Sequence, residues 1–557
     1  MNLNTKSSRG ITLIALVVTI IVLLILAGIS ISMLSGDNGL LQRATDAKDQ
    51  IDRARKIEQE QIDNLGGSMN DFVDGYDENK NVNKPKLTTG MVPVNYNTSK
   101  KQWEECSLEN WDWNYEEQSS TTENGGTSKW ANAMTEDGSL WVWIPRYAYK
   151  IKSGYHTSIA GEIDIVFLVG ATNKDKDGIT YATSYDMTTA TTNGYMSDFV
   201  VHPAFGSNLT QGGWGYDTPG FWVAKFEAGF AGTPGEPTTA QDSTVKYTSN
   251  LYYNFTKIYD NIYGPIIPDE TLMKYPTFTP GAFSYVCVSV GDAFGLSKSL
   301  NANGNPYGFT QNCNTHQMKN SEWGAVAYLT HSKYGRNETE ISVNNWGPAG
   351  SLSTTGQCYY TTDYNNTFFV ARTGYSAGSV TPSAGRNNGD ISTTNYYNTS
   401  EGVVASTTGN VYGVYDLSGG AYEYVASYCD TLNKGAIHSS GSAQPFYDEY
   451  GSYLLSETNK KYKELFSRNL EQTSQGSSWA THNNIFGDAM WEVSPIGNDE
   501  GKCWNGDQSY YPYSVSAFLE RGGSFGDGAL AGVFYFGCSR GYLNNNMGFR
   551  ACVVSPD

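Results

Sequence analysis

One stretch near the N-terminus constrains the fold more than any other feature: residues 11–34 (ITLIALVVTIIVLLILAGISISML) carry no charged side chain. About 20 apolar residues are enough to cross a bilayer as a helix. Lys6 and Arg9 precede the stretch, and basic residues keep their flank cytoplasmic. We therefore expect a transmembrane helix over 11–34, with the rest of the chain outside, at the membrane and cell surface. A secretory signal peptide is the alternative, but its apolar core is usually only about 7–15 residues long.

The remainder of the chain has the composition of a loop-rich extracellular protein. It is 557 residues long, which is several times the roughly 150 residues of one domain. Charged residues make up 17%, whereas there are 60 Gly, 40 Tyr and 13 Trp, so turns and aromatic strands are expected in place of charged helices. The formal charge of −19 argues against nucleic acid as a partner, because phosphate neutralisation requires basic side chains.

The junction Arg9-Gly10-Ile11 supports a more specific interpretation. With the apolar stretch that follows, it resembles the leader of type IV prepilins, a short basic peptide that prepilin peptidase removes after a Gly. The resemblance implies a leader over 1–10, cleavage between Gly10 and Ile11, and pilin-like subunits as partners. That family has a Glu at the fifth mature position, where this chain has Ala15, so the residue used in pilus assembly is missing. A plain uncleaved membrane anchor is the alternative.

Between the apolar stretch and residue 140 the pattern changes twice. Residues 35–65 begin with a Gly-containing break and are then rich in Ala, Glu, Gln, Lys and Arg, which predicts a solvated stalk helix. Residues 66–139 are polar and rich in Gly, Asn and Thr, which predicts a linker or small β region. The aromatic and β-branched run over 140–151 predicts strands whose bulky side chains pack in a core.

Four motifs follow in order. They are HPAF (202–205) with GFWVAKFEAG (220–229), MKNSEWGAVAYL (318–329), YGVYDLSGGAYEYV (412–425), and RGGSF (521–525) leading to MGFRACV (547–553). Together they resemble the formylglycine-generating-enzyme type of C-type lectin fold, over residues 140–557. The resemblance implies a helix at the EW motif and strands at the RGGS and GFR segments. The expected fold class is thus α+β: a pilin-like transmembrane helix and stalk, then a large, loop-rich C-type-lectin-like domain.

The enzyme activity of that family is not expected here. Its copper-binding Cys pair lies three and eight residues beyond the Ser of RGGS, where this chain has Asp527 and Gly532. Soft Cu(I) requires thiolates, and neither residue supplies one. The six His residues form no HExxH motif, and there is no Walker or dinucleotide motif. We assign no catalytic residue, although a carboxylate pair that meets only in space would escape a sequence search.

Calcium is the one cofactor for which the sequence offers candidates. Asp416 and Glu423 supply carboxylates in the third motif, and Ca²⁺ prefers oxygen ligands. The resemblance implies an Asn where this chain has Gly420, which removes one oxygen. The alternative is that Glu423 forms a hydrogen bond within the core.

The eight cysteines give no clear disulfide framework, because their spacings are wide and irregular. A chain of this size does not need a stapled core. We expect one or two disulfides at most, and buried thiols otherwise.

The segment 525–546, between RGGS and MGFR, has the composition of a binding surface. It is rich in Gly, Asn, Ser and aromatics, the residues that paratopes use for contact and adaptable hydrogen bonding. It resembles the variable region of proteins diversified by diversity-generating retroelements, in which template adenines are randomised. Randomised AAC codons cannot encode Lys, Glu, Gln, Met or Trp, and the segment contains none of these. The expected variable positions are Phe525, Asp527, Leu530, Tyr535, Gly537, Cys538, Ser539, Arg540, Tyr542, Leu543 and Asn544.

The sequence therefore predicts a binding protein, not an enzyme, whose partner is a protein or cell-surface ligand of unknown identity. We expect Ala at Tyr535, Arg540 and Tyr542 to abolish binding with little loss of melting temperature. Arg521 and Arg550 are expected to pair with core carboxylates or carbonyls and to matter for folding. The alternatives are a fixed minor pilin or adhesin of a type IV pilus-like system and, third, a formylglycine-generating-type enzyme. A conventional buried strand pair would also explain Val533, Phe534 and Phe536.

Overall fold

The computed structural model describes thirteen segments of the chain. They are residues 75–118, 127–230, 275–282, 284–286, 288–347, 371–382, 387–388, 395–429, 451–466, 485–495, 503–512, 516–542 and 546–555. The chain divides into two compact units, Met1–Phe72 and Val73–Asp557, and every described residue belongs to the second. The predicted leader with Gly10 and Ile11, the apolar stretch 11–34 and the stalk 35–65 lie outside the described residues.

The expected α+β class with an N-terminal transmembrane helix is corrected by the structure, which is mainly β-sheet. The described residues form four α-helices: α4 (Met187–Asn193), α6 (Val290–Lys298), α7 (Asn320–His331) and α9 (Ser452–Ser456). None of these helices is long and apolar enough to cross a membrane. Gly, Asn, Thr and aromatic residues favour turns and strands over helices, which accounts for the short helices.

The largest sheet has seven strands, in the order β13-β21-β10-β6-β5-β3-β4, and all its pairs are antiparallel. Its strands are β13 (Asn314–Gln317), β21 (Ala551–Val554), β10 (Gly220–Ala224), β6 (Leu140–Pro145), β5 (Asn132–Thr135), β3 (Met91–Asn97) and β4 (Gln102–Glu105). Every residue of β6 and β10 is buried, as the aromatic run over 140–151 predicts. Strands β3, β4 and β5 come from the range 66–139 and share this sheet with β6.

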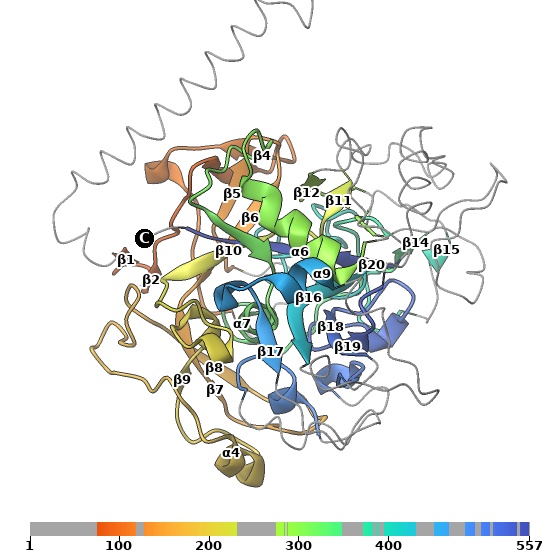
Figure 1. The fold of residues 1–557 in the computed structure, drawn as a ribbon. Helices are drawn as coiled ribbons and strands as arrows, with labels where there is room; N and C mark the ends of the chain where they lie inside the picture. The colour runs from red at the N-terminus through yellow and green to blue at the C-terminus, as the bar shows by residue number, and fades with distance from the viewer. Residues whose placement is uncertain are drawn as a thin grey trace, which may run out of the picture. The chain divides into compact units, whose positions relative to one another are not determined.

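A second sheet has five strands and includes the Arg of the RGG motif and the Gly and Phe of the GFR motif. Its path is β17-β16-β18-β19, with β20 paired to β16 (Figure 1). The strands are β17 (Glu464–Phe466), β16 (Tyr422–Cys429), β18 (Phe518–Arg521), β19 (Phe536–Ser539) and β20 (Met547–Phe549). β16 pairs in parallel with β17 and β20 and antiparallel with β18.

The remaining strands form small sheets. β7 (Tyr147–Ile151) lies between β8 (Ile163–Phe167) and β9 (Val200–Val201). Three two-stranded pairs are β1 (Tyr76–Asp77) with β2 (Val82–Asn83), β11 (Gly229–Phe230) with β12 (Pro276–Thr277), and β14 (Trp346–Gly347) with β15 (Asn387–Asn388).

Helix α7 carries the EW motif and is buried along its whole length, as the motif resemblance implies for a helix at this place. Its first turn is closed by a capping box, in which the backbone N–H of Lys319 donates to Glu322 Oε2 at 2.9 Å. Trp323 donates from Nε1 to the Val533 carbonyl at 2.8 Å. Because Val533 belongs to the segment 525–546, this hydrogen bond ties the backbone of that segment to α7.

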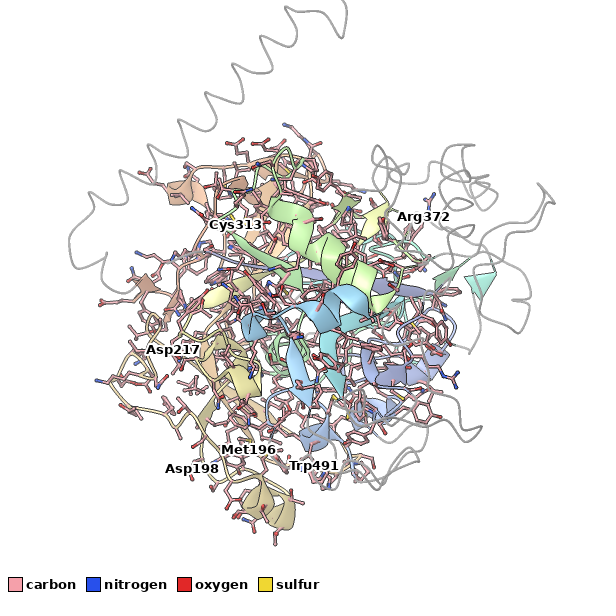
Figure 2. The ribbon with its side chains drawn as sticks, in the orientation of Figure 1. Met196, Asp198, Asp217, Cys313, Arg372 and Trp491 are labelled. Atoms are coloured by element: carbon pink, nitrogen blue, oxygen red, sulfur yellow. The ribbon has the colours of Figure 1, made fainter. Side chains whose placement is uncertain are left out.

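The interior is filled by large side chains, including buried tryptophans and arginines (Figure 2). Trp143 on β6 and Trp222 on β10 are direct partners on neighbouring strands, and their ring centroids lie 5.3 Å apart. Asp217, labelled in Figure 2, accepts from Arg146 at 2.9 Å, so this buried guanidinium has a carboxylate partner. Burial without such partners would be costly for a charge.

Candidate functional site

Arg521 anchors the start of the predicted binding segment. It ends β18 and is fully buried, and its guanidinium donates to Asn320 Oδ1 at 2.8 Å and to the carbonyls of Asp488 and Ala489 at 3.0 and 3.1 Å. Burial lowers its pKa to about 10, which leaves it charged at neutral pH. The expectation that Arg521 pairs with core carbonyls is confirmed, whereas its importance for folding stays a prediction.

Arg550 anchors the other end. Its Nε and Nη2 donate to the two carboxylate oxygens of Glu423 at 2.9 and 2.6 Å, and it also donates to the carbonyls of Ala224 and Tyr415. Burial alone would lower the pKa of Arg550, but the bidentate carboxylate raises it above its usual value. Arg550 thus joins β20 and β21 to β16. We call Arg521 and Arg550, the two buried arginines on either side of the segment 525–546, the frame.

A tight turn carries the chain from β18 into the segment. Gly522 and Gly523 have φ of 82° and 72°, a backbone region that favours glycine. The carboxylate of Asp527 then accepts from the Ser524 backbone N–H at 2.7 Å, the Ser524 hydroxyl at 2.9 Å and the Tyr422 hydroxyl at 2.8 Å. These bonds hold Asp527 half-buried at the sheet edge.

The pairing of strands β18 and β19 buries Glu520 close to Asp527. Glu520 pairs with Gly537, and a Cβ on Gly537 would lie 2.6 Å from Glu520 Oε1. Burial, and then the neighbouring charge of Asp527, raises the pKa of Glu520 to about 8. Gly537 therefore provides room for a largely protonated carboxyl in a place where a larger residue would displace it.

Two tyrosines and a serine complete the support. Tyr535 is 1% exposed, and its ring packs against Tyr422 with centroids 5.7 Å apart. The Tyr424 hydroxyl is within 2.8 Å of Ser539 Oγ and donates to the Tyr542 carbonyl at 2.8 Å. The backbone that carries Tyr542 is therefore tied to β16.

The structure divides the predicted variable positions by exposure. Arg540 is exposed and Tyr542 is 39% exposed, whereas Asp527, Leu530 and Cys538 are partly exposed. The other described positions are buried: Phe525, Tyr535, Gly537 and Ser539. Leu543 and Asn544 lie outside the described residues.

This division corrects one expectation about stability. Tyr535 is as buried as a core residue, so replacing it by Ala leaves a cavity and costs stability. Only Arg540 and Tyr542 of that set stand where truncation removes little packing. An exposed guanidinium beside an exposed phenol is suited to contact a partner surface, because Arg and Tyr are frequent energetic anchors of interfaces.

The calcium candidates Asp416 and Glu423 serve protein donors in this structure. Asp416 accepts from the Gly374 backbone N–H at 2.9 Å and from Asn344 Nδ2 at 2.8 Å, and Glu423 holds Arg550. Burial raises the pKa of Asp416 to about 6 and that of Glu423 to about 7. Within the described part of the chain, neither belongs to a group of three metal-binding side chains.

A carboxyl pair that the sequence did not reveal lies beside a small recess. The recess has a volume of about 10 Å³, room for about one water molecule, and is lined by residues that include His331, Glu340 and Phe534. Burial, and then the adjacent Asp507, raises the pKa of Glu340, and burial raises the pKa of Asp507. Asp507 also accepts from the Phe534 backbone N–H at 2.9 Å, which ties the pair to the frame.

A second cluster that sequence reasoning missed joins His316, Glu322 and Cys552. His316 and Cys552 are direct partners in the β13–β21 pair, and Glu322 lies in the first turn of α7. A spacing search could not reveal the cluster, because Cys552 is far from the other two residues in sequence. Cys313 and Cys503 are further buried free thiols, and Cys287 and Cys358 lie outside the described residues.

No protein-family model matches this chain, and no curated protein is similar to it.

Proposed function

We propose that the chain is a ligand-binding protein of the cell exterior, whose contact surface is the outer end of the segment 525–546 and whose specificity a retroelement varies. The motifs that resemble retroelement-diversified proteins support this proposal, as does the acidic, aromatic and Gly-rich composition. Function is then recognition: side chains change while the backbone stays in place.

The observation that carries the proposal is the contrast between support and surface in this segment. Arg521 and Arg550 are fully buried and bonded on either side of it, whereas Arg540 and Tyr542 between them are exposed. A rigid backbone that presents exposed Arg and Tyr side chains lowers the entropy lost on binding.

The structure also narrows the set of positions that can vary without loss of the fold. We propose that variation is concentrated at the exposed and partly exposed positions, namely Asp527, Leu530, Cys538, Arg540 and Tyr542. Gly537 is the clearest exclusion, because a side chain there would displace the buried carboxyl of Glu520.

Deep sequencing of the final hundred or so bases of the gene, across a growing population of the source cells, tests diversification directly. The proposal expects changes concentrated at codons of the exposed positions, with a near-copy of the segment and a reverse transcriptase gene nearby. An invariant segment without a copy would reject diversification and leave a fixed adhesin as the remaining proposal.

A library tests the binding surface independently of any retroelement. The five exposed or partly exposed codons are randomised, the full chain is displayed, and binders are selected against hen lysozyme. A matched control library randomises Ile159, Ile179 and Tyr195, which are 75%, 55% and 47% exposed elsewhere on the chain. We expect binders from the first library and not from the control; equal yields would contradict a specialised surface.

A further inference from the structure

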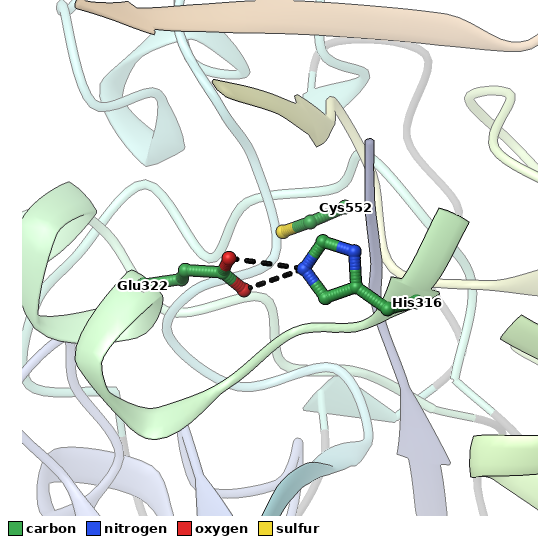
Figure 3. Close-up of side chains that lie close together, drawn as sticks. All are labelled: His316, Glu322 and Cys552. Atoms are coloured by element: carbon green, nitrogen blue, oxygen red, sulfur yellow. Dashed lines mark hydrogen bonds and ion pairs between the residues drawn. The ribbon is translucent and has the colours of Figure 1, made fainter. Parts of the chain in front are cut away.

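The cluster of His316, Glu322 and Cys552 combines three metal-ligand chemistries in one buried place (Figure 3). One ligand atom from each side chain lies within 4.8 Å of the other two. The three residues come from β13, the start of α7 and β21, so the cluster joins the helix of the EW motif to the last strand. It is separate from the proposed binding surface.

Both ring nitrogens of His316 face hydrogen-bond acceptors. Nδ1 lies 3.0 Å from the Asn314 carbonyl, and Nε2 lies 3.0 and 2.9 Å from the two oxygens of Glu322 (Figure 3). Donation from Nδ1 to the Asn314 carbonyl leaves the lone pair of Nε2 directed at the Glu322 carboxylate, an arrangement that a metal cation held by both groups would satisfy. A backbone carbonyl on the far nitrogen is the usual support of a metal-bound histidine.

We infer that His316 Nε2, Glu322 and Cys552 Sγ form a structural Zn²⁺ site. Zn²⁺ accepts nitrogen, oxygen and thiolate ligands together in a tetrahedral arrangement. Neighbouring ligand atoms on a tetrahedral zinc lie about 3.3–3.5 Å apart, so the 2.9–3.0 Å Nε2–oxygen distances are close, and the widest separation shortens by roughly 1 Å. Both Glu322 oxygens face the site, so the carboxylate can supply two of four donor atoms.

The thiol proton of Cys552 leaves to solvent when the sulfur binds the ion as a thiolate. The charges of Zn²⁺ (+2), the Glu322 carboxylate (−1) and the Cys552 thiolate (−1) then sum to zero. The loaded cluster therefore places no net charge in an interior where an extra charge would be costly. The zinc–thiolate bond takes the place of the S–H bond that breaks.

The positive groups Lys319 and Arg550 oppose the ion, and both act electrostatically on Cys552. Lys319 Nζ lies 3.8 Å from Glu322 Oε1. The ammonium group of Lys319 has two other partners. It donates to the Gly212 carbonyl at 2.5 Å and lies 4.2 Å from the centre of the Trp214 ring. All three proposed ligands are fully buried, so the site has no open position for a substrate and serves the fold.

Metal analysis of the untagged full chain tests the inference. The chain is unfolded in denaturant with a chelator present, and is refolded either with Zn²⁺ or without metal. After dialysis, the metal content is measured by mass spectrometry. We expect about one zinc per wild-type chain and less than about a tenth in Cys552→Ser. Cys503→Ser is the matched control, because Cys503 is also a fully buried thiol, and it should retain about one zinc.

Cobalt gives a second readout, and on the wild-type chain it does not depend on how any variant folds. Wild-type chain refolded with Co²⁺ should show a thiolate-to-cobalt absorption band in the near ultraviolet and the strong visible bands of tetrahedral Co²⁺. Glu322→Gln should weaken both metals' binding while keeping a side chain that can cap α7. A folded wild-type chain that holds neither ion, or equal zinc in Cys552→Ser and Cys503→Ser, would overturn the site.

Discussion

Arg550 and Arg540 lie on the same C-terminal stretch, and their surroundings could hardly differ more. Arg550 is fully buried and holds Glu423 with two hydrogen bonds, whereas Arg540 stands exposed at the end of β19. The first belongs to a frame that includes Arg521, and the second to a surface that includes Tyr542. One short stretch thus contains both buried residues that hold the backbone and exposed residues that face solvent.

The energetic reason lies in desolvation. A buried charge that loses its partner is left in a medium that solvates it poorly, so removing one member of such a pair is strongly destabilising. An exposed charge is solvated by water with or without a partner, so its removal changes stability little. Four variants sharpen this contrast between frame and surface, from the largest expected effect to the smallest.

Arg550→Met should have the largest effect, because it leaves the Glu423 carboxyl buried without its bidentate donor. We expect the free energy of unfolding to fall by about 3–5 kcal/mol, measured by urea denaturation. The double variant Arg550→Met with Glu423→Gln should recover part of the loss. A single variant as stable as wild type would remove Arg550 from the frame.

Tyr535→Ala tests the buried part of the segment itself. Its ring is 1% exposed and packs on Tyr422, so truncation should cost about 3 kcal/mol or more, as for other large core aromatics. Tyr535→Phe is the control, because it keeps the ring and loses only the hydroxyl. If Tyr535→Ala unfolds at the same urea concentration as wild type, the segment is not divided as the structure indicates.

Glu520→Gln should change how stability depends on pH. Burial, and then Asp527, raises the pKa of Glu520 to about 8 in the folded chain, against an ordinary value of about 4.3. The folded chain then binds the proton of Glu520 more tightly than the unfolded chain does. This proton stabilises the folded chain fully below about pH 4, and the stabilisation is lost as pH rises to about 8.

The variant lacks this proton and should gain Tm relative to wild type between pH 5 and pH 9, by a few degrees. Glu109→Gln, at an exposed carboxylate, serves as the control and should show no such change. Parallel Tm curves for Glu520→Gln and wild type would mean that Glu520 ionises normally.

The double variant Arg540→Ala with Tyr542→Ala should have the smallest effect on stability, within about 0.5 kcal/mol for each exposed residue. In a lysozyme binder selected from the library, Ala at positions 540 and 542 should weaken binding at least tenfold, because these two exposed positions lie at the centre of the proposed contact surface. A large drop in Tm would move these residues from the surface to the frame.

Several local features could be predicted from the sequence. The aromatic run over 140–151 forms buried strands, and the EW motif lies on a helix. Strand β18 ends at the Arg of RGG and strand β20 covers the Gly and Phe of GFR, so the prediction of strands at these motifs is confirmed only in part. The partners of Arg521 and Arg550 are the predicted kinds, carbonyls and a carboxylate. These features depend on periodicity and on the cost of burying a charge, both of which act locally.

Other features were predicted incorrectly or missed. The α+β class was wrong because helix-forming composition before residue 66 was given the weight of a fold class, and the described chain is mainly sheet. The exposure of Tyr535 was misjudged because the composition of a Gly-rich segment does not show whether a Tyr in it faces solvent or packs against Tyr422. His316 and Cys552 meet only through strand pairing, which no spacing reveals.

By itself the sequence determined the acidic balance, the strand-forming aromatic runs, and which arginines required buried partners. Only the tertiary structure decided which residues of 525–546 face solvent, that Glu520 is buried beneath Asp527, and that a histidine, a glutamate and a cysteine share one place. The physical reason is that composition and period describe a residue's neighbours along the chain, whereas desolvation, shared protons and metal binding depend on neighbours that strand register and packing bring together.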